Sequence, residues 1–367
     1  MPRGLLISGI GLLMLLTGHV RSQLTNEKQP VVKGKTASEW IDILEKDQKV
    51  ERRRAALIAL GILGPKVPGV ITGVSSGLND SDATVRRSAA QTLGEMGPGA
   101  KNAVDSLART LESDKDQAVR EVAAKALGRI GADAKYAVSS LANALQDRHA
   151  GTRAAAAEAL GRIGVNARAA SPKLIPLLKD PDQLVRSFAA HALGRIGPEA
   201  RAAVPALSEA LTGDANPSVR RSAAEALGEM GSHARPAVTA LGVALKDKQV
   251  EVRRAAAGAL TKLGTEARAA LSALSAAFKD QDKLVRSLAI QCIGALGKDA
   301  ESAIPSLAQC LTDEAVEVRL VAVEELGRLG AVAKPALPAL KEVEKGDSRA
   351  VVREAAREAL KKIETPG

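Results

Sequence analysis

Few residues in this chain have side chains suited to nucleophilic, acid–base or metal chemistry. The histidines and cysteines are His19, His149, His191, His233, Cys292 and Cys310. A mononuclear metal site needs three or four ligands that converge in space, and these side chains are scattered along the chain. The sequence also lacks a Walker loop and a glycine-rich dinucleotide-binding turn. We therefore predict a protein that is not an enzyme and that binds neither a metal ion nor a cofactor.

Arginine and aspartate, in contrast, recur at the fixed spacing that a charged binding row would need. The arginines follow one another every 33 or 34 residues: Arg53, Arg86, Arg120, Arg153, Arg186, Arg220, Arg253, Arg286, Arg319 and Arg353. An aspartate stands six residues before each of them: Asp47, Asp80, Asp114, Asp147, Asp180, Asp214, Asp247, Asp280, Asp313 and Asp347. We name these two sets the ladder arginines and the ladder aspartates.

The ladder arginines could bind a row of phosphate groups, but a structural role accounts for them better. A cation in the first turn of a helix opposes the helix dipole by about 0.3–1 kcal/mol, and ten uncompensated copies would add up to a large cost. An aspartate six residues earlier supplies the compensating charge and can also accept hydrogen bonds from backbone amides. We therefore predict that each ladder arginine pairs with the aspartate of its own repeat, as in Asp180 with Arg186.

The residues around each ladder arginine define the element that must position it. Alanine stands three residues after the arginine in all ten copies, leucine seven after it with Ile293 as the one isoleucine, and glycine eleven after it in nine copies. Apolar positions at −1, +3, +4, +7 and +10 from the arginine share one helical face. We expect the glycines at +8 and +11 to close this helix.

A second periodic segment, such as residues 202–211, precedes each aspartate. Each repeat is thus a first helix (helix A), a turn at the aspartate, a second helix (helix B) and a glycine turn. A lone hairpin of this kind cannot bury both apolar faces, whereas stacked copies can. The sequence predicts an all-α protein, an α-solenoid of about ten two-helix repeats over residues 37–367.

The repeat has the frame V-P-x-L-x-x-x-L-x-D-x-x-x-x-V-R-x-x-A-x-x-A-L-G-x-I-G. It resembles the HEAT repeat, in the short HEAT-like form that phycobilin-lyase-type proteins also use, over residues 37 to 364. The residues that carry the resemblance include the helix A prolines Pro68, Pro176, Pro205, Pro305 and Pro338. The resemblance implies an Asp–Arg ladder and a scaffold or adaptor, with a lyase-like enzyme as an alternative. The His-Glu pairs of the di-iron HEAT-repeat hydroxylase are missing.

The two ends differ from the repeats between them. Thr36 and Glu39 have capping-box spacing at the start of a first helix. In the tenth copy the apolar +4 position is Arg357, and the two glycines are replaced by Lys361 and Glu364. A polar, solvent-exposed outer face of this kind is typical of the end of a solenoid.

The first 36 residues are expected to be outside the solenoid. Residues 5–16 form an uncharged apolar run that is too short to span a bilayer, and with Arg3 before it and Ser22 after it the run is typical of a signal peptide. We expect cleavage after Ser22, an exported location (periplasmic or secreted) and a polar linker over residues 23–36. A retained anchor is the alternative. The chain without residues 1–22 would carry 50 basic and 42 acidic residues.

Helix B is expected to line the concave side of the array, with positions +1, +5 and +9 facing outward. The +9 position is arginine in three consecutive repeats, Arg129, Arg162 and Arg195, and Lys125 lies beside them. Glu121 and Glu158 dilute this charge, so the row is either a solvated mixed surface or a binding site for an acidic partner.

Three function classes follow from these features. The first is an exported scaffold that binds another protein, with an acidic surface, through its curved face. The second is a polyanion binder, and the third is an enzyme. The chain has only four aromatic residues, Trp40, Tyr136, Phe188 and Phe278. Single-stranded nucleic acid is usually stacked on such residues, so nucleic acid is a poor match.

The two cysteines allow two interpretations. Cys292 takes the place of the usual alanine at +6 on helix B, and Cys310 takes the place of a small residue on the next helix A. They are either two small core residues or a disulfide between neighbouring helices, which an exported protein permits.

Overall fold

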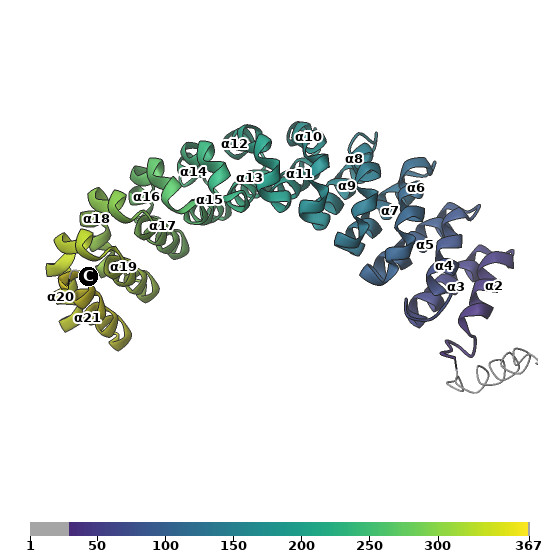
Figure 1. Ribbon diagram of the computed structural model, residues 1–367, viewed down its shortest axis with the longest axis horizontal. Coiled ribbons are helices and arrows are strands. Elements are labelled where there is room, and N and C mark those ends of the chain that lie inside the picture. Colours follow the sequence, from purple (N-terminus) through teal and green to yellow (C-terminus); the bar gives the residue numbers. More distant parts are fainter. Residues whose placement is uncertain (1–28, 366–367) are drawn as a thin grey trace, which may run out of the picture.

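The computed structural model describes residues 29–365, which form ten helical hairpins stacked side by side in an arc (Figure 1). The first helices of the hairpins lie along the outer rim of the arc and the second helices along its inner rim. The predicted all-α solenoid is therefore confirmed, and helix B lines the concave side. The signal peptide predicted for residues 1–22 and the first part of the predicted linker lie outside the described residues.

The outer helices are the A helices of the sequence pattern. They are α2 Ala37–Lys46, α4 Val70–Ser76, α6 Val104–Ser113, α8 Val138–Ala144, α10 Ser171–Leu174, α12 Val204–Gly213, α14 Val238–Ala244, α16 Leu271–Ala277, α18 Ile304–Gln309 and α20 Leu337–Gly346. Short 3-10 turns extend three of them: η1 Gly77–Asn79, η5 Ile175–Lys179 and η10 Cys310–Thr312. With these turns included, the outer helices end at or within three residues of a ladder aspartate, where the turn to helix B begins; Asp114, for example, is the C-cap of α6 and has an extended backbone.

The inner helices are the B helices. They are α3 Val50–Leu63, α5 Ala83–Glu95, α7 Gln117–Ile130, α9 Ala150–Ile163, α11 Gln183–Ile196, α13 Pro217–Glu229, α15 Val250–Leu263, α17 Lys283–Ala295, α19 Val316–Leu329 and α21 Ala350–Glu364. Five of them begin at an Asp or Asn N-cap, as in α5, where the Asp82 carboxylate accepts a hydrogen bond from the Thr84 amide at 2.8 Å. An oxygen at this position satisfies an amide that the first turn leaves without a partner.

The glycine eleven residues after each ladder arginine ends helix B, as the sequence predicts. All nine of these glycines have positive φ, for example 73° at Gly131, a conformation that costs glycine little. A 3-10 turn then leads to the next helix A. These turns are η2 Gly97–Ala103, η3 Gly131–Ala137, η4 Gly164–Ala170, η6 Gly197–Ala203, η7 Gly231–Ala237, η8 Gly264–Ala270, η9 Gly297–Ala303 and η11 Gly330–Ala336.

The glycine at +8 has a different role from the one that we expected. Gly194 lies inside α11 rather than at its end, and a Cβ there would lie 2.6 Å from the Cα of Ala226 in α13. Gly128 likewise approaches the Cα of Ala159 in the next repeat. The expectation that this glycine closes the helix is wrong, because its function is to let adjacent B helices come close together.

Two residues at +6, the position that faces this glycine, depart from alanine near the C-terminal end. Cys292 is fully buried, and Glu325 is only 3% exposed with its carboxylate over Gly294. Burial raises the pKa of Glu325, and Arg328 offsets part of this effect with Nη1 3.0 Å from Oε2. Cys292 and Cys310 are both buried free thiols, and burial raises the pKa of each to about 12. They behave as small core residues.

The ends of the solenoid are finished differently from its middle. The predicted capping box is present, since the Thr36 amide donates to Glu39 at 2.7 Å and the Glu39 amide donates to Thr36. Trp40 donates its indole N–H to the carbonyl of Val32 at 3.1 Å, so the end of the predicted linker packs on the first repeat. At the other end, exposed Arg357 pairs with Glu344 and Glu354.

The close contact between B helices can be tested with one substitution made at two glycines. We expect Gly194→Ala to lower the free energy of unfolding by about 1–2 kcal/mol, because the new methyl group would overlap the backbone of α13. Gly258→Ala is the control. A Cβ at Gly258, in the interior of α15, meets no atom within 4 Å, so its better helix propensity should raise stability by about 0.5–1 kcal/mol. Equal effects on the urea denaturation midpoint would contradict this role of the +8 glycine.

Candidate functional site

The ladder arginines and aspartates form ion pairs between consecutive repeats. The Nε atom of each of the first nine ladder arginines lies 2.7 or 2.8 Å from Oδ2 of the aspartate in the following repeat. The nine pairs are Arg53–Asp80, Arg86–Asp114, Arg120–Asp147, Arg153–Asp180, Arg186–Asp214, Arg220–Asp247, Arg253–Asp280, Arg286–Asp313 and Arg319–Asp347. These side chains are largely buried, so the pairs connect the repeats along one edge of the array.

The predicted pairing within a repeat is therefore wrong, although the residues are the ones predicted. Arg186 does not pair with the Asp180 side chain; it donates from Nη1 to the main-chain carbonyl of Asp180 at 2.9 Å and directs Nε to Asp214. The Asp180 carboxylate accepts instead from Arg153 and from the Asp182 amide at 2.9 Å. The arginine side chain points along the axis of the solenoid, which brings the next aspartate within reach.

Hydrogen bonding leaves the ladder arginines with little capacity for an outside ligand. Nε and Nη2 of Arg153 both donate to Asp180, and Nη1 donates to the carbonyls of Asp147 and Arg148. Burial opposes ionisation of Asp180, but the bonds from Arg153 and from the Asp182 amide outweigh it and lower its pKa. The pKa of Asp180 is therefore lower in the folded protein than in the unfolded chain. The stability that the ionised carboxylate contributes is present at neutral pH and is lost as the pH falls through the folded pKa.

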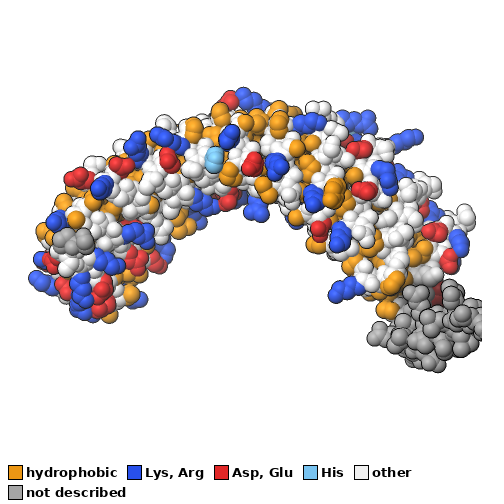
Figure 2. Space-filling view, in the orientation of Figure 1, with side chains coloured by type: hydrophobic (Ala, Val, Ile, Leu, Met, Phe, Trp, Pro, Cys, Tyr) orange, Lys and Arg blue, Asp and Glu red, His pale blue; other side chains and the backbone are white. Residues whose placement is uncertain are grey.

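The +9 row of helix B lies on the concave face, where the sequence placed it. Arg129, Arg162 and Arg195 are exposed on α7, α9 and α11, which are consecutive inner helices. Arg162 pairs with Glu158 at 2.8 Å, whereas Arg129 and Arg195 have no ion-pair partner among residues 29–365. Figure 2 shows basic side chains along the inner rim of the arc near its middle. Two free guanidinium groups therefore flank one paired group.

Two further side chains belong to this concave surface. Lys125 forms an ion pair with Glu121 four residues earlier, which neutralises the charge that the sequence placed beside the row. His191 is exposed beside Arg195, and the neighbouring helices exclude enough water to lower its pKa, an effect to which Arg195 adds. His191 is therefore neutral at neutral pH and does not add to the positive charge.

Comparisons with known proteins agree with this geometry. A family model described as HEAT repeats matches residues 37–128, 104–174, 171–242, 204–293 and 270–361. The chain belongs to the HEAT-repeat family. No functionally characterised protein sequence matches it.

Solved structures that resemble this HEAT-repeat chain include an engineered protein, Kap95p and Kap121p. The engineered protein (Northeast Structural Genomics Consortium target OR497) is 22% identical with a TM-score of 0.62, over 90% of this chain and 99% of the engineered one. Kap95p, solved with RanGDP, is 18% identical with a TM-score of 0.57, over 89% of this chain and 49% of its own. Kap121p, bound to Pho4p, is 17% identical with a TM-score of 0.55, over 85% and 40%. This chain spans half or less of the length of Kap95p and of Kap121p. Sequence identities this low show that the fold is shared and nothing more.

The HEAT-repeat array carries a second basic row that the sequence analysis missed. One basic residue lies fifteen positions after the ladder arginine in six consecutive repeats: Lys101, Lys135, Arg168, Arg201, Arg235 and Arg268. All six are exposed in the 3-10 turns, and among them only Arg235 forms an ion pair within the described chain, with Glu266 at 3.1 Å. The constant offset from the ladder would have identified this edge row. Acids two residues before three of its members, Asp133, Glu199 and Glu266, reduce its net charge.

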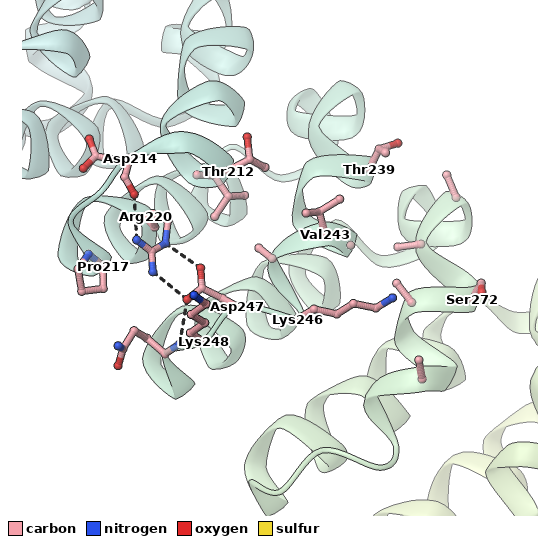
Figure 3. Close-up of a pocket in the computed structure, with 18 of the residues that line it drawn as sticks. Thr212, Asp214, Pro217, Arg220, Thr239, Val243, Lys246, Asp247, Lys248 and Ser272 are labelled. Atoms are coloured by element: carbon pink, nitrogen blue, oxygen red, sulfur yellow. Dashed lines mark hydrogen bonds and ion pairs between the residues drawn. The ribbon is translucent and has the colours of Figure 1, made fainter.

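A cavity on the outer side of the arc does not resemble an active site. It has a volume of about 900 Å³ and lies between α12, α14 and α16 on the outer side of the arc (Figure 3). The ladder pair Arg220–Asp247 forms one side of it, and exposed Val243 lies on another. Its lining contains no histidine or cysteine, and its floor is made of small residues such as Gly242 and Ala273.

The remaining chemically reactive residues are not brought together. No group of three or more metal-ligating side chains forms within residues 29–365. Residues 73–77 read G-V-S-S-G, which matches the nucleophile-elbow motif, but Ser75 lies inside α4 rather than on a turn between a strand and a helix. None of the described helices combines the length and hydropathy needed to cross a bilayer.

The direction of pairing in the ladder can be tested with double-mutant cycles. Asp180→Ala should lower the free energy of unfolding by about 1–3 kcal/mol, because it leaves the buried Arg153 guanidinium without its carboxylate. The cycle with Arg153→Ala should show a coupling of at least about 1 kcal/mol, and the cycle with Arg186→Ala less than about 0.5 kcal/mol. Glu158→Ala is the control and should cost under about 0.5 kcal/mol, because Glu158 is partly exposed and forms only a surface i,i+4 pair with Arg162. If urea denaturation shows stronger coupling of Asp180 to Arg186 than to Arg153, the pairing lies within one repeat and the pairing described here is wrong.

Proposed function

We propose that this protein is a non-enzymatic, exported scaffold that binds an acidic segment of another protein along its concave face. The observation that carries the proposal is the concave row, in which Arg129 and Arg195 are exposed on either side of Arg162 and have no ion-pair partner within the described part of the chain. The guanidinium fork suits bidentate contact with carboxylates. Kap95p and Kap121p, which share the fold, were solved with the protein partners RanGDP and Pho4p.

The chemistry of the concave face favours a protein over a polyanion. The acids Glu121, Glu158 and Glu229 are interleaved with the arginines, so a continuous phosphate or sulfate chain would meet repulsion at each of them. A folded or extended protein segment can alternate its own charges to match. The scarcity of aromatic residues also removes the stacking on which single-stranded nucleic acid depends.

The exported location rests on residues 1–22, with one early arginine and the apolar run at residues 5–16. N-terminal sequencing of the native protein should therefore begin at Gln23 or within a few residues of it. The measurement needs protein from its natural source, fractionated into cytoplasmic and exported pools. An intact Met1 in the cytoplasmic pool would contradict export and would leave the binding proposal untouched.

The binding surface can be tested with two triple charge reversals that change the net charge equally. Arg129→Glu, Arg162→Glu and Arg195→Glu alter the concave row, and Arg168→Glu, Arg201→Glu and Arg268→Glu alter the edge row. Proteins captured from the nuclease-treated exported fraction should bind the wild type and the edge variant alike. The concave variant should bind them at least about 100-fold more weakly, because attraction becomes repulsion at three adjacent points.

The helical circular dichroism and melting temperature of both variants should match the wild type, since all six side chains are exposed. Equal capture by the concave variant and the wild type would show that the row is a solvated surface. Loss of capture in the edge variant alone would move the binding site to the 3-10 turns.

A further inference from the structure

The concave face also carries a cleft with two exposed isoleucines at its N-terminal end. Ile58 and Ile62, one turn apart on α3, have 63% and 68% of their surface exposed. They line a cleft of about 570 Å³ between α3 and α5, together with Gly61, Pro65 and Met96. No other pair of large apolar side chains one helical turn apart is this exposed within residues 29–365.

Packing within the repeats does not explain these two isoleucines. Ile58 occupies position +5 and Ile62 position +9, and in the other nine repeats these positions hold polar, charged or small residues. Gly61 is the +8 glycine of this repeat and lets α3 approach Thr92 in α5, because a Cβ at Gly61 would lie only 3.2 Å from Thr92 Cγ2; both residues line the cleft. Burying an exposed aliphatic side chain against another surface lowers the free energy, whereas leaving it in water gives no such stabilisation.

Ile62 in the cleft and the concave arginines occupy the same +9 position of helix B. Position +9 holds Ile62 in α3, Glu95 in α5 and then Arg129, Arg162 and Arg195 in α7, α9 and α11. Stacked helices are about 10 Å apart, and an extended chain rises about 3.3 Å per residue. One repeat therefore corresponds to about three residues of an extended ligand, and two repeats separate Ile62 from Arg129.

The rim of the cleft is polar and partly charged. Arg54 donates to Ser88 at 3.4 Å, and Gln91 donates to Glu95 at 2.8 Å, so both sides of the cleft are held by contacts between neighbouring side chains. Glu95 lies between the isoleucines and the arginines and would repel a carboxylate placed there.

We propose that this cleft binds aliphatic side chains at one end of the same acidic segment that the concave row binds. The inference rests on the proposed function and adds a sequence rule and a direction to it. The segment has one or two aliphatic residues, a neutral or basic residue about three positions later opposite Glu95, and carboxylates about six, nine and twelve positions after the first aliphatic residue. The aliphatic end lies on α3, and the acidic end lies toward α11.

The test uses defined synthetic peptides and the purified protein. The matched peptide has two leucines, a lysine three positions after the first leucine, and glutamates six, nine and twelve positions after it, separated by Gly and Ser. In the second peptide serine replaces both leucines. In the third, of the same composition, the leucines lie between the glutamates. Fluorescence anisotropy gives the Kd of each peptide for each protein variant.

Ile58→Ser with Ile62→Ser should weaken binding of the matched peptide by about ten- to 100-fold, which is the effect of losing buried aliphatic surface. The same variant should bind the serine peptide as the wild type does, and the wild type should bind the third peptide more weakly than the matched one. Val165→Ser with Val243→Ser, two exposed aliphatic residues away from the cleft, is the control variant and should bind all three peptides unchanged.

The variants also separate the failure of this inference from the failure of the proposed function. If the concave triple reversal weakens binding but the isoleucine variant does not, the cleft is not an anchor and the proposed function stands. If the triple reversal has no effect on any peptide, the proposed function and this inference both fall. Concentration-dependent sedimentation of the wild type that the isoleucine variant abolishes would show that a second copy covers the cleft, which overturns the inference.

Discussion

The ion pair between a ladder arginine and the aspartate of the next repeat is the interaction on which the geometry of this array depends. The apolar faces that the repeats bury are made mostly of alanine, leucine and valine, and such contacts have little directional preference. The guanidinium group, in contrast, has a rigid fork that fits one carboxylate in one orientation. Because Arg153 also holds the carbonyls of its own turn, each pair fixes the position of one turn relative to the next.

This role does not require the pairs to contribute much net stability. The desolvation of two charges offsets most of the attraction between them, so a buried ion pair is often close to neutral against an apolar replacement. Breaking one side is costly all the same, because it leaves a charge without a partner. In a repeat array, where a slip of one hairpin would still bury alanine against alanine, the ladder supplies the specificity of register that the core lacks.

The contact between glycine and alanine on the B helices sets the second constraint. Gly194 approaches the backbone of Ala226, and the same contact recurs at Gly128 and Ala159. The inner helices therefore pack through some of their smallest residues, and the array curves with the B helices inside. The outward positions of helix B are free of these packing demands. Isoleucines, arginines and glutamates can vary there from repeat to repeat without disturbing the solenoid, and this is where a partner would be recognised.

The period, the helical faces, the glycine that ends helix B and the capping box at Thr36 follow from the sequence alone, because each depends on residues within one turn or one hairpin. The outward direction of Arg129, Arg162 and Arg195 follows from the phase of helix B, and their concave placement follows from the resemblance to HEAT-like arrays. The ladder partner could not be derived in this way. The first nine ladder arginines each have an aspartate six residues before them and another 27 or 28 residues after them, and only the stacking of hairpins shows which of the two the side chain reaches. The role of the glycine at +8 could not be derived either. In the sequence it resembles a residue that ends a helix, and its contact with the next B helix exists only once the repeats are packed together.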